Sequence, residues 1–267
     1  MTGHMTQSDN KKALFEKICN EDRASGGYGE LCTYNEKRLH RAVKRYIFES
    51  ECTRHALSEY EGYETRVGRY VADILLSGVI FEIQTGSVRP LKKKLEYYIE
   101  NTDYSVVVVI PLKKDTELLR VDMESGELIS KKRSPKHERI KDKLCDLVYI
   151  SELLSLGRVR VRYLEVCGEE QRYSERVRGR KSGAYDKEYF PLSLADVTEY
   201  TSPEDFWEFI PRSLNINEGF SAAEYGKAMK LSGRKLYNTL NFFCGMGMLE
   251  REKQDSKYIY SKKEAGD

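Results

Sequence analysis

The chain has 267 residues, 40% of them hydrophobic and 33% charged, which excludes a disordered chain and indicates a folded globular protein. Its 45 lysines and arginines nearly cancel its 43 aspartates and glutamates, so the formal net charge of +2 identifies no polyanionic partner. The six cysteines are scattered and form no C-x-x-C pair, which excludes a zinc ribbon. No apolar run is long enough to span a membrane. Because no secretory signal is present either, we predict a cytoplasmic protein with free thiols.

The first half of the sequence predicts a helix, three strands, a helix and a strand, in that order. Residues 1–34 are polar and glycine-rich, and we expect a loose N-terminal arm there. Apolar residues at helical spacing predict a helix over residues 35–49. Two strands are expected within residues 55–78, a third over 79–86, a basic helix over 89–101 with Pro90 near its start, and a buried strand over 104–112. This order predicts an α/β domain over residues 35–156, in which an antiparallel meander leads into a parallel crossover.

The second half of the sequence is more charged. Residues 146–154 are a weaker candidate for a strand or a helix, and residues 157–200 predict a strand-rich basic extension. A helix is expected to begin after Ser202, with Ser202 as its N-cap and Pro203 in its first position. Residues 201–263 are therefore assigned to a separate small domain.

Two acidic residues and an amide interrupt an otherwise apolar stretch, YVADILLSGVIFEIQ (residues 70–84). With Ser77–Gly78 as a two-residue type I′ turn, the register of the hairpin places Asp73 directly opposite Glu82. Gln84 follows on the same face, because side chains alternate along a strand. The opposite face is apolar throughout, with Ala72, Ile74, Leu76, Val79, Phe81 and Ile83.

Two like charges directly opposite each other destabilise a strand pair, so a compensating group is expected. Mg²⁺ or Mn²⁺ fits this position, because either cation binds carboxylate oxygens, keeps several waters and shares its shell with a phosphate. The alternative is a solvent-exposed face on which Asp73 pairs with a basic neighbour such as Arg69.

The order helix, "VAD", short hairpin, "FEIQ", helix and "SVVVVIP" resembles the PD-(D/E)XK nuclease superfamily over about residues 35–112. The resemblance implies a restriction-endonuclease-like fold, a mixed sheet flanked by helices with an αβββαβ core. It also implies hydrolysis of phosphodiester bonds with Mg²⁺ or Mn²⁺, Asp73 and Glu82 being the metal-binding acids. Double-stranded DNA is the expected substrate, and a homodimer is expected by analogy only.

The sequence departs from the family pattern at Gln84, which stands where the motif has a lysine. A neutral amide offers no cation to the attacking water or to the phosphate. One of the lysines at 92–94 could reach back from the following helix, and Lys93 is taken as the candidate. The substitution leaves open a member of the fold that binds DNA without cutting it.

A third acid is expected near the pair. Many relatives place a glutamate on the first helix, which makes Glu36 a candidate metal ligand. The alternative is a first-turn glutamate favoured by the helix dipole. Glu59 and Glu61 could take its place, although a solvated strand edge is the simpler interpretation of both. His40 is interpreted as a packing or phosphate-contact residue.

Residues 219–263 resemble a winged helix-turn-helix: a capping box at Ser221 and Glu224, two short helices and a charged β-hairpin. The resemblance implies contact of the second helix with the DNA major groove and of the wing with phosphates. The implied contact residues are Arg234, Lys235, Asn238 and Lys257. The alternative is a module for protein interaction or packing.

The basic run RVRGRK (residues 176–181) is the third candidate element for DNA binding, through Arg178, Arg180 and Lys181. A solvated hairpin tip is the alternative. Three functions thus stay open: a metal-dependent nuclease assisted by a winged helix, a DNA-binding protein that has lost catalysis, and a protein-interaction scaffold.

Overall fold

The computed structural model describes residues 7–25, 37–52, 62–174 and 186–263. Its first part contains α1 (Gln7–Ser25), α2 (Arg38–Cys52), β1 (Gly62–Val67), β2 (Tyr70–Leu76), β3 (Val79–Ile83), the 3₁₀ helix η1 (Arg89–Leu91), α3 (Lys92–Asn101) and β4 (Ser105–Asp122). The order from α2 to β4 is the helix, three strands, helix and strand that the sequence predicts.

The remaining elements complete the sheet and form the C-terminal segment. They are β5 (Leu128–Arg133), α4 (Ile140–Lys143), η2 (Leu144–Tyr149), α5 (Ser151–Ser155), β6 (Val159–Ser174), β7 (Asp186–Tyr200), η3 (Pro203–Phe209), β8 (Phe220–Ser221), α6 (Ala222–Met229), α7 (Gly233–Gly245), β9 (Leu249–Gln254) and β10 (Lys257–Lys262). Among the described residues, no helix is both long enough and apolar enough to cross a membrane.

The protein is a mixed α/β structure built on a seven-stranded sheet of order β1-β2-β3-β4-β6-β7, with β5 paired to β4. Strands β1, β2 and β3 are antiparallel, and β4 runs parallel to both β3 and β6. The predicted change from a meander to a parallel crossover is therefore confirmed, with α3 as the crossover helix. The strand-rich region expected over 157–200 supplies β6 and β7, which continue this same sheet. The domain boundaries stay predictions.

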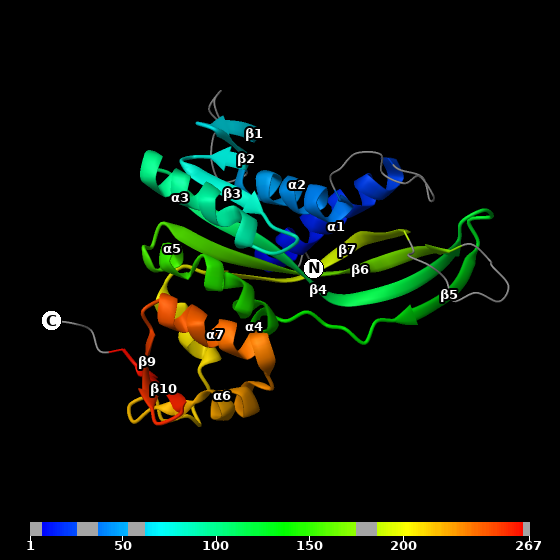
Figure 1. Ribbon diagram of the computed structural model, residues 1–267. Coiled ribbons are helices and arrows are strands. Elements are labelled where there is room, and N and C mark those ends of the chain that lie inside the picture. The colour runs from blue at the N-terminus through cyan, green and yellow to red at the C-terminus, as the bar shows by residue number, and fades with distance from the viewer. Residues whose placement is uncertain (1–6, 26–36, 53–61, 175–185, 264–267) are drawn as a thin grey trace, which may run out of the picture.

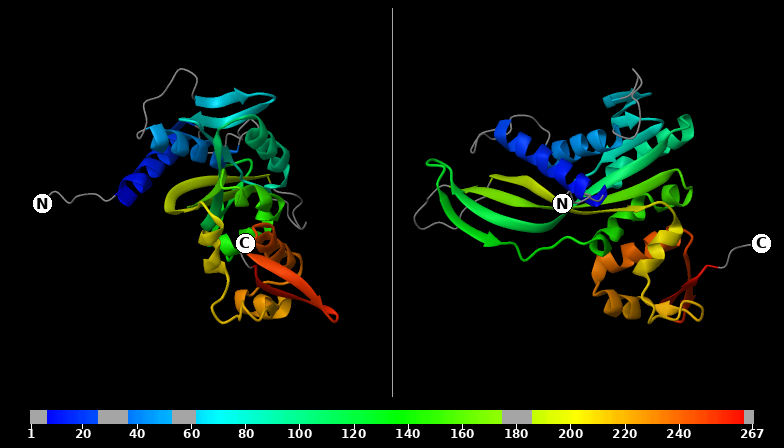
Figure 2. Two further views of the ribbon diagram at one scale, coloured as in Figure 1. Left: turned by 90° about the vertical axis from the view of Figure 1, so that its left-hand side faces the viewer. Right: turned by 180° about the vertical axis from the view of Figure 1, so that it is seen from behind.

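Helices cover both faces of the sheet (Figures 1 and 2). Helices α1 and α2 pack on one face, over a buried cluster that includes Phe15, Val43 and Val107. On the other face α3, η2, α5 and the C-terminal segment share a second cluster, which includes Val108 and Phe242. The C-terminal segment is thus joined to the sheet by a continuous apolar core.

The hairpin between β2 and β3 forms as the sequence predicts. Ser77 and Gly78 have φ angles of 47° and 74°, the two positive values that a type I′ turn requires. The pairs nearest the turn have the predicted register. Ser77 is not a glycine, so its left-handed conformation costs some free energy. The pairing of the two strands offsets this cost.

Two expectations are corrected. The predicted loose arm contains a 19-residue helix, α1, whose residues Phe15, Ile18 and Cys19 are buried at helical spacing. In the hairpin, both faces are buried and not only one: Leu75 and Ile80 share the face of Glu82 and pack in the α3-side core. Ala72 also packs in that core, whereas Ile74, Leu76, Phe81 and Ile83 lie in the opposite one, as predicted.

Helices begin near the other positions that the sequence predicts, although their type or bounds differ slightly. Pro90 lies in η1, directly before α3. The weak candidate at 146–154 is helical, with no strand. Ser202 caps η3, a 3₁₀ helix, and its N–H donates to Asp205 Oδ2 at 3.0 Å. Ser221 and Glu224 form the predicted capping box of α6.

Candidate functional site

Asp73 lies where strands β2 and β3 separate. The hydrogen-bonded pairing of the two strands runs from the turn to Ile74 and Phe81 and ends there. Beyond that point Asp73 Oδ2 accepts a hydrogen bond from the Ile83 N–H at 2.7 Å. The direct backbone pairing of Asp73 with Glu82 does not form, because the carboxylate takes the Ile83 N–H and the two strands diverge.

Glu82 is a buried acid on the α3 side of the sheet, only 2% exposed. Its Oε2 accepts from Lys94 Nζ at 2.6 Å, and its Oε1 accepts from the Tyr98 hydroxyl at 3.2 Å. Burial raises the pKa of Glu82 to about 7, Lys94 opposes that rise, and the negative charge of Asp73 adds to it. The two carboxylates are thus electrostatically coupled across the gap between β2 and β3.

Helix α3 presents Lys94 and Tyr98 to Glu82 from positions one turn apart. Leu95 and Tyr98 are buried in the α3-side core, which fixes the rotation of the helix about its axis. Burial, followed by the negative charge of Glu82, raises the pKa of Tyr98, so the hydroxyl stays a donor. Lys93 is exposed, and Lys94 makes the contact in its place.

His40 of α2 lies near the other acid, Asp73. Its Nε2 lies 3.8 Å from Asp73 Oδ2, so a protonated imidazole would form an ion pair there. Arg69, the alternative partner of Asp73, instead places its guanidinium carbon 5.2 Å and 5.0 Å from the ring centroids of Tyr70 and Tyr97. The solvent-exposed pairing with Arg69 is therefore not what the structure shows.

Gln84 closes the loop that follows β3. Its side-chain Nε2 donates to the Ser87 carbonyl at 2.7 Å, and its backbone N–H donates to the Val109 carbonyl at 2.8 Å. The amide therefore holds the loop before η1, and the cation next to Glu82 comes from α3.

Several candidate residues lie outside the described residues. They are Glu36, Glu59, Glu61, Arg178, Arg180 and Lys181. Within the described ranges, no group of three or more His, Cys, Asp or Glu side chains converges to hold a metal ion. Asp73 and Glu82 are two acids, one fewer than such a group.

The charge of Glu82 and the donors preferred by a hard divalent cation can be compared at this pair. A pKa of about 7 means that the described surroundings, Lys94 included, do not fully compensate the charge of Glu82. Mg²⁺ accepts one or two carboxylates and completes its shell with water and substrate phosphate. Both oxygens of Glu82 already accept hydrogen bonds, from Lys94 and Tyr98, and Asp73 Oδ2 accepts one from the Ile83 N–H, so a cation would have to share these oxygens with their present donors.

In the C-terminal segment, the outer face of α7 is polar. Arg234 and Lys235 are exposed, Asn238 is half-buried, and Tyr237 between them is 53% exposed. The inner face is apolar and packs in the core. Arg234 Nη2 donates to the Tyr149 hydroxyl at 2.9 Å, which links the start of α7 to η2.

The hairpin of β9 and β10 extends this polar face. Arg251 Nη1 donates to Asn241 Oδ1 of α7 at 2.8 Å, and its guanidinium carbon lies 5.2 Å from the ring centroid of Tyr258. Tyr258 is 48% exposed, and Lys257 beside it is exposed. The structure therefore brings three of the four predicted contact residues onto α7, with Lys257 on the adjacent hairpin.

Two residues of the acidic site were not identified individually from the sequence. The sequence offers three adjacent lysines at 92–94 without distinguishing Lys94, and no motif marks Tyr98. The spacing of Leu91, Leu95 and Tyr98 was the available signal, because it sets which side of the helix faces the sheet.

Comparisons with known proteins give one result. No curated protein and no solved structure matches the chain. A family model described as a domain of unknown function, DUF8091, matches residues 37–200, which run from the start of α2 to the end of β7. This match includes the acidic site and the whole seven-stranded sheet, and the C-terminal segment follows it. The chain therefore belongs to the DUF8091 family.

Proposed function

We propose that this protein is a nuclease that hydrolyses phosphodiester bonds, in double-stranded DNA, with the help of Mg²⁺ or Mn²⁺. The observation that carries the proposal is the convergence of Asp73, Glu82 and Lys94 where β2 and β3 separate. Two coupled acids and a cation at the end of a strand pair are a costly arrangement, which a purely structural role does not require.

The fold supports the proposal. The order of elements from α2 to β4, and the change from antiparallel to parallel pairing at β3, agree with a restriction-endonuclease-like αβββαβ core. The acids lie in the hairpin of that core, which is the position that the resemblance assigns to them.

Each residue of the site has a separate role in this proposal. Asp73 and Glu82 would hold the cation, and a bound cation would supply an acidified water and stabilise charge on the leaving oxygen. Lys94 orients the Glu82 carboxylate and places a positive charge next to the scissile phosphate. Tyr98 holds the other oxygen of Glu82. His40 Nε2 lies 3.8 Å from Asp73 Oδ2 and would add a polar group to the same side of the site.

The C-terminal segment would act as a winged helix in this proposal. Its three-stranded sheet has the order β8-β10-β9 and accompanies the two helices α6 and α7. Helix α7 would offer Arg234 and Asn238 to base edges in the major groove, and Lys257 would contact a phosphate.

A plasmid-nicking assay tests the nuclease proposal. The full chain should cut DNA with Mg²⁺ or Mn²⁺ and not with a chelator, and Asp73→Ala should lower the rate by at least about 10³-fold. Arg69→Ala is the matched control, because Arg69 neighbours the hairpin but lies over Tyr70 and Tyr97. Cleavage that survives Asp73→Ala would contradict the proposal.

A second candidate is a DNA-binding protein without catalysis. Gln84 stands where the nuclease motif has a lysine, and its side chain donates to the Ser87 carbonyl. The absence of a cation at this position favours the second candidate. The same assay separates the two, because this candidate predicts retention of the plasmid with no cutting under any divalent cation.

A further inference from the structure

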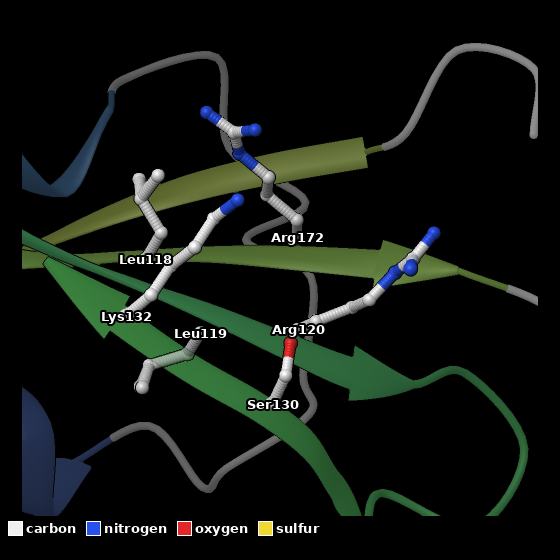
Figure 3. A pocket seen from close by; sticks show the side chains of 6 residues that line it. All are labelled: Leu118, Leu119, Arg120, Ser130, Lys132 and Arg172. Carbon is white, nitrogen blue, oxygen red and sulfur yellow. The ribbon is translucent and has the colours of Figure 1, made fainter. Parts of the chain in front are cut away.

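Two clusters of arginine and lysine lie outside the acidic site. The first lines a pocket of about 220 Å³ on β4, β5 and β6 (Figure 3). In this pocket Arg172 is already ion-paired with Glu170, through Nη2 at 2.7 Å and Nε at 2.8 Å. The second cluster lies on α7 and on the hairpin of β9 and β10, where the acids are kept apart from the cations. The residues that line the pocket are Leu118, Leu119, Arg120, Ser130, Lys132 and Arg172.

Helix α7 carries one stripe of polar and aromatic side chains on its outer face. The members of the stripe follow at positions i, i+3, i+4 and i+7, the spacing that places residues on one side of a helix. Helix α7 contains no acidic residue, so nothing within the helix neutralises its cations. The stripe consists of Arg234, Tyr237, Asn238 and Asn241.

Strand pairing sorts the charged residues of the hairpin onto opposite faces. Lys253 pairs with Tyr258, and Arg251 pairs with Tyr260. Directly paired residues share a face, so these cations and tyrosines lie on the same side of the hairpin. Both glutamates of β9 fall on the other side, because side chains alternate along a strand.

Arg251 joins the cationic side of the hairpin to α7. Its Nη1 donates to Asn241 Oδ1 at 2.8 Å, and its guanidinium carbon lies 5.2 Å from the ring centroid of Tyr258. Tyr237 precedes Asn241 by one helical turn. The rings of Tyr237 and Tyr258 are 53% and 48% exposed, and in the described part of residues 201–263 no other large hydrophobic side chain is as exposed. We call this surface the tyrosine face; it consists of the α7 stripe with Arg251, Lys253 and Tyr258.

A chain of contacts connects the tyrosine face with the acidic site. Arg234 Nη2 donates to the Tyr149 hydroxyl at 2.9 Å, and the guanidinium carbon of Arg89 lies 5.6 Å from the centroid of the same ring. Arg89 is the first residue of η1, which leads directly into α3 and Lys94. The start of α7 is thus joined to the helix that supplies the cation next to Glu82.

The chemistry of the tyrosine face fits a nucleic-acid strand with unpaired bases. Exposed aromatic rings beside cations bind such strands, because the bases stack on the rings and the cations contact the phosphates. Stacking also removes apolar ring surface from water. In a closed duplex the faces of the bases are covered by their neighbours, so Tyr237 and Tyr258 would have nothing to stack on.

We propose that the tyrosine face binds unpaired bases, with Tyr237 and Tyr258 as the stacking residues and Arg251 and Lys253 as phosphate contacts. The inference rests on the proposed function in one respect, namely that the bound strand belongs to the DNA that the nuclease cuts. The substrate is then a duplex that continues into a single-stranded segment.

Binding of fluorescent DNA to the full chain, with a chelator present to prevent cleavage, tests the inference. The two probes are a blunt duplex and the same duplex with a single-stranded overhang. The wild type should bind the overhang probe more tightly. Tyr237→Ala/Tyr258→Ala should weaken binding of the overhang probe about 30-fold and of the blunt duplex by less than about twofold. The salt dependence should stay unchanged, because this variant removes no cation.

Two control variants separate stacking from other effects. Tyr237→Phe/Tyr258→Phe keeps both rings and should bind like the wild type. Tyr63→Ala removes a tyrosine of β1 that is 42% exposed, and should leave the binding of both probes unchanged.

Equal affinity of the wild type for the two probes would overturn the inference, as would equal losses in the alanine and phenylalanine variants. Failure of the nuclease is read separately, from cleavage with Mg²⁺ or Mn²⁺. Tight binding of the overhang probe, lost in the alanine variant and accompanied by no cleavage, would support the tyrosine face and reject the nuclease.

Discussion

The two polar clusters on the α3 side of this protein differ in burial. Glu82 is buried and Asp73 and Lys94 beside it are half-buried, whereas most polar side chains on the outer face of α7 and on its hairpin are exposed. Burying a charge is costly unless it is paired, so the acidic site has strict geometry and a shifted pKa. The exposed cations on α7 keep their hydration, so they cost little free energy on folding, and salt screens their charge.

This difference indicates separate tasks. Glu82 is buried and burial raises its pKa to about 7, so this acid can exchange a proton at physiological pH, as the proposed chemistry would require. An exposed row of arginine, asparagine and tyrosine suits positioning of a polyanion. The following variants test that division.

Of the variants that test this division, Lys94→Met is expected to have the largest effect. Removing the ammonium next to Glu82 should lower cleavage about 10²- to 10³-fold, as loss of one charge-stabilising donor does in other enzymes. It should also move the rising limb of the pH–rate profile to higher pH, because Lys94 opposes the raised pKa of Glu82. Lys93→Met is the control and should keep the profile unchanged. An equal loss in both variants would argue against the specific role of Lys94.

The next effect concerns stability and pH. The folded-state pKa of Glu82, about 7, lies above its usual value of 4.5, so the fold favours the protonated acid. This contribution is complete below pH 4.5 and is lost as the pH rises through 7, with a total on the order of 3 kcal/mol. The free energy of unfolding of the wild type, measured with denaturant at a series of pH values, should fall across this window. Glu82→Gln should flatten the dependence on pH. A wild-type curve with no slope in this window would contradict the burial argument.

A smaller effect is expected from Arg234→Ala/Asn238→Ala on α7. Loss of two base-edge contacts should weaken duplex binding about 30-fold, or roughly 2 kcal/mol. Unfolding should change by less than about 1 kcal/mol, because the lost bond to Tyr149 is a surface hydrogen bond. Lys227→Ala, at an exposed position of α6, is the matched control. Unchanged binding would favour a packing role for this segment.

The smallest effect is expected from Lys257→Ala on the hairpin. Loss of one phosphate contact should weaken duplex binding roughly threefold and lower the salt slope by about 1. Fluorescence anisotropy across a salt series measures both quantities. A loss confined to one DNA sequence would indicate a base contact instead.

Local features were readable from the sequence because their causes are local. Ser77–Gly78 specified the turn, the turn specified the register, and the register placed both acids near the same end of the hairpin. The capping box at Ser221 and Glu224 was equally predictable, since both partners lie within one helical turn. The order of helices and strands from α2 to β4 followed from the spacing of apolar residues.

Other features depended on contacts between distant segments. The choice of Lys94 over Lys93 follows from how α3 rotates to bury Leu95 and Tyr98 against the sheet. Helix α1 was missed because its few apolar residues are outnumbered by polar ones, and they acquire meaning only when β7 and α2 cover them.

The sequence by itself determined the hairpin, the order of the elements and the identity of the acid pair, because each depends on residues that are close along the chain. Only the tertiary structure decided that the pairing opens at Asp73, that Glu82 is buried under α3, and that Arg120 and Arg172 share a pocket. The physical reason is that burial and strand pairing between distant segments set the electrostatic environment of a charge, and no local pattern encodes them.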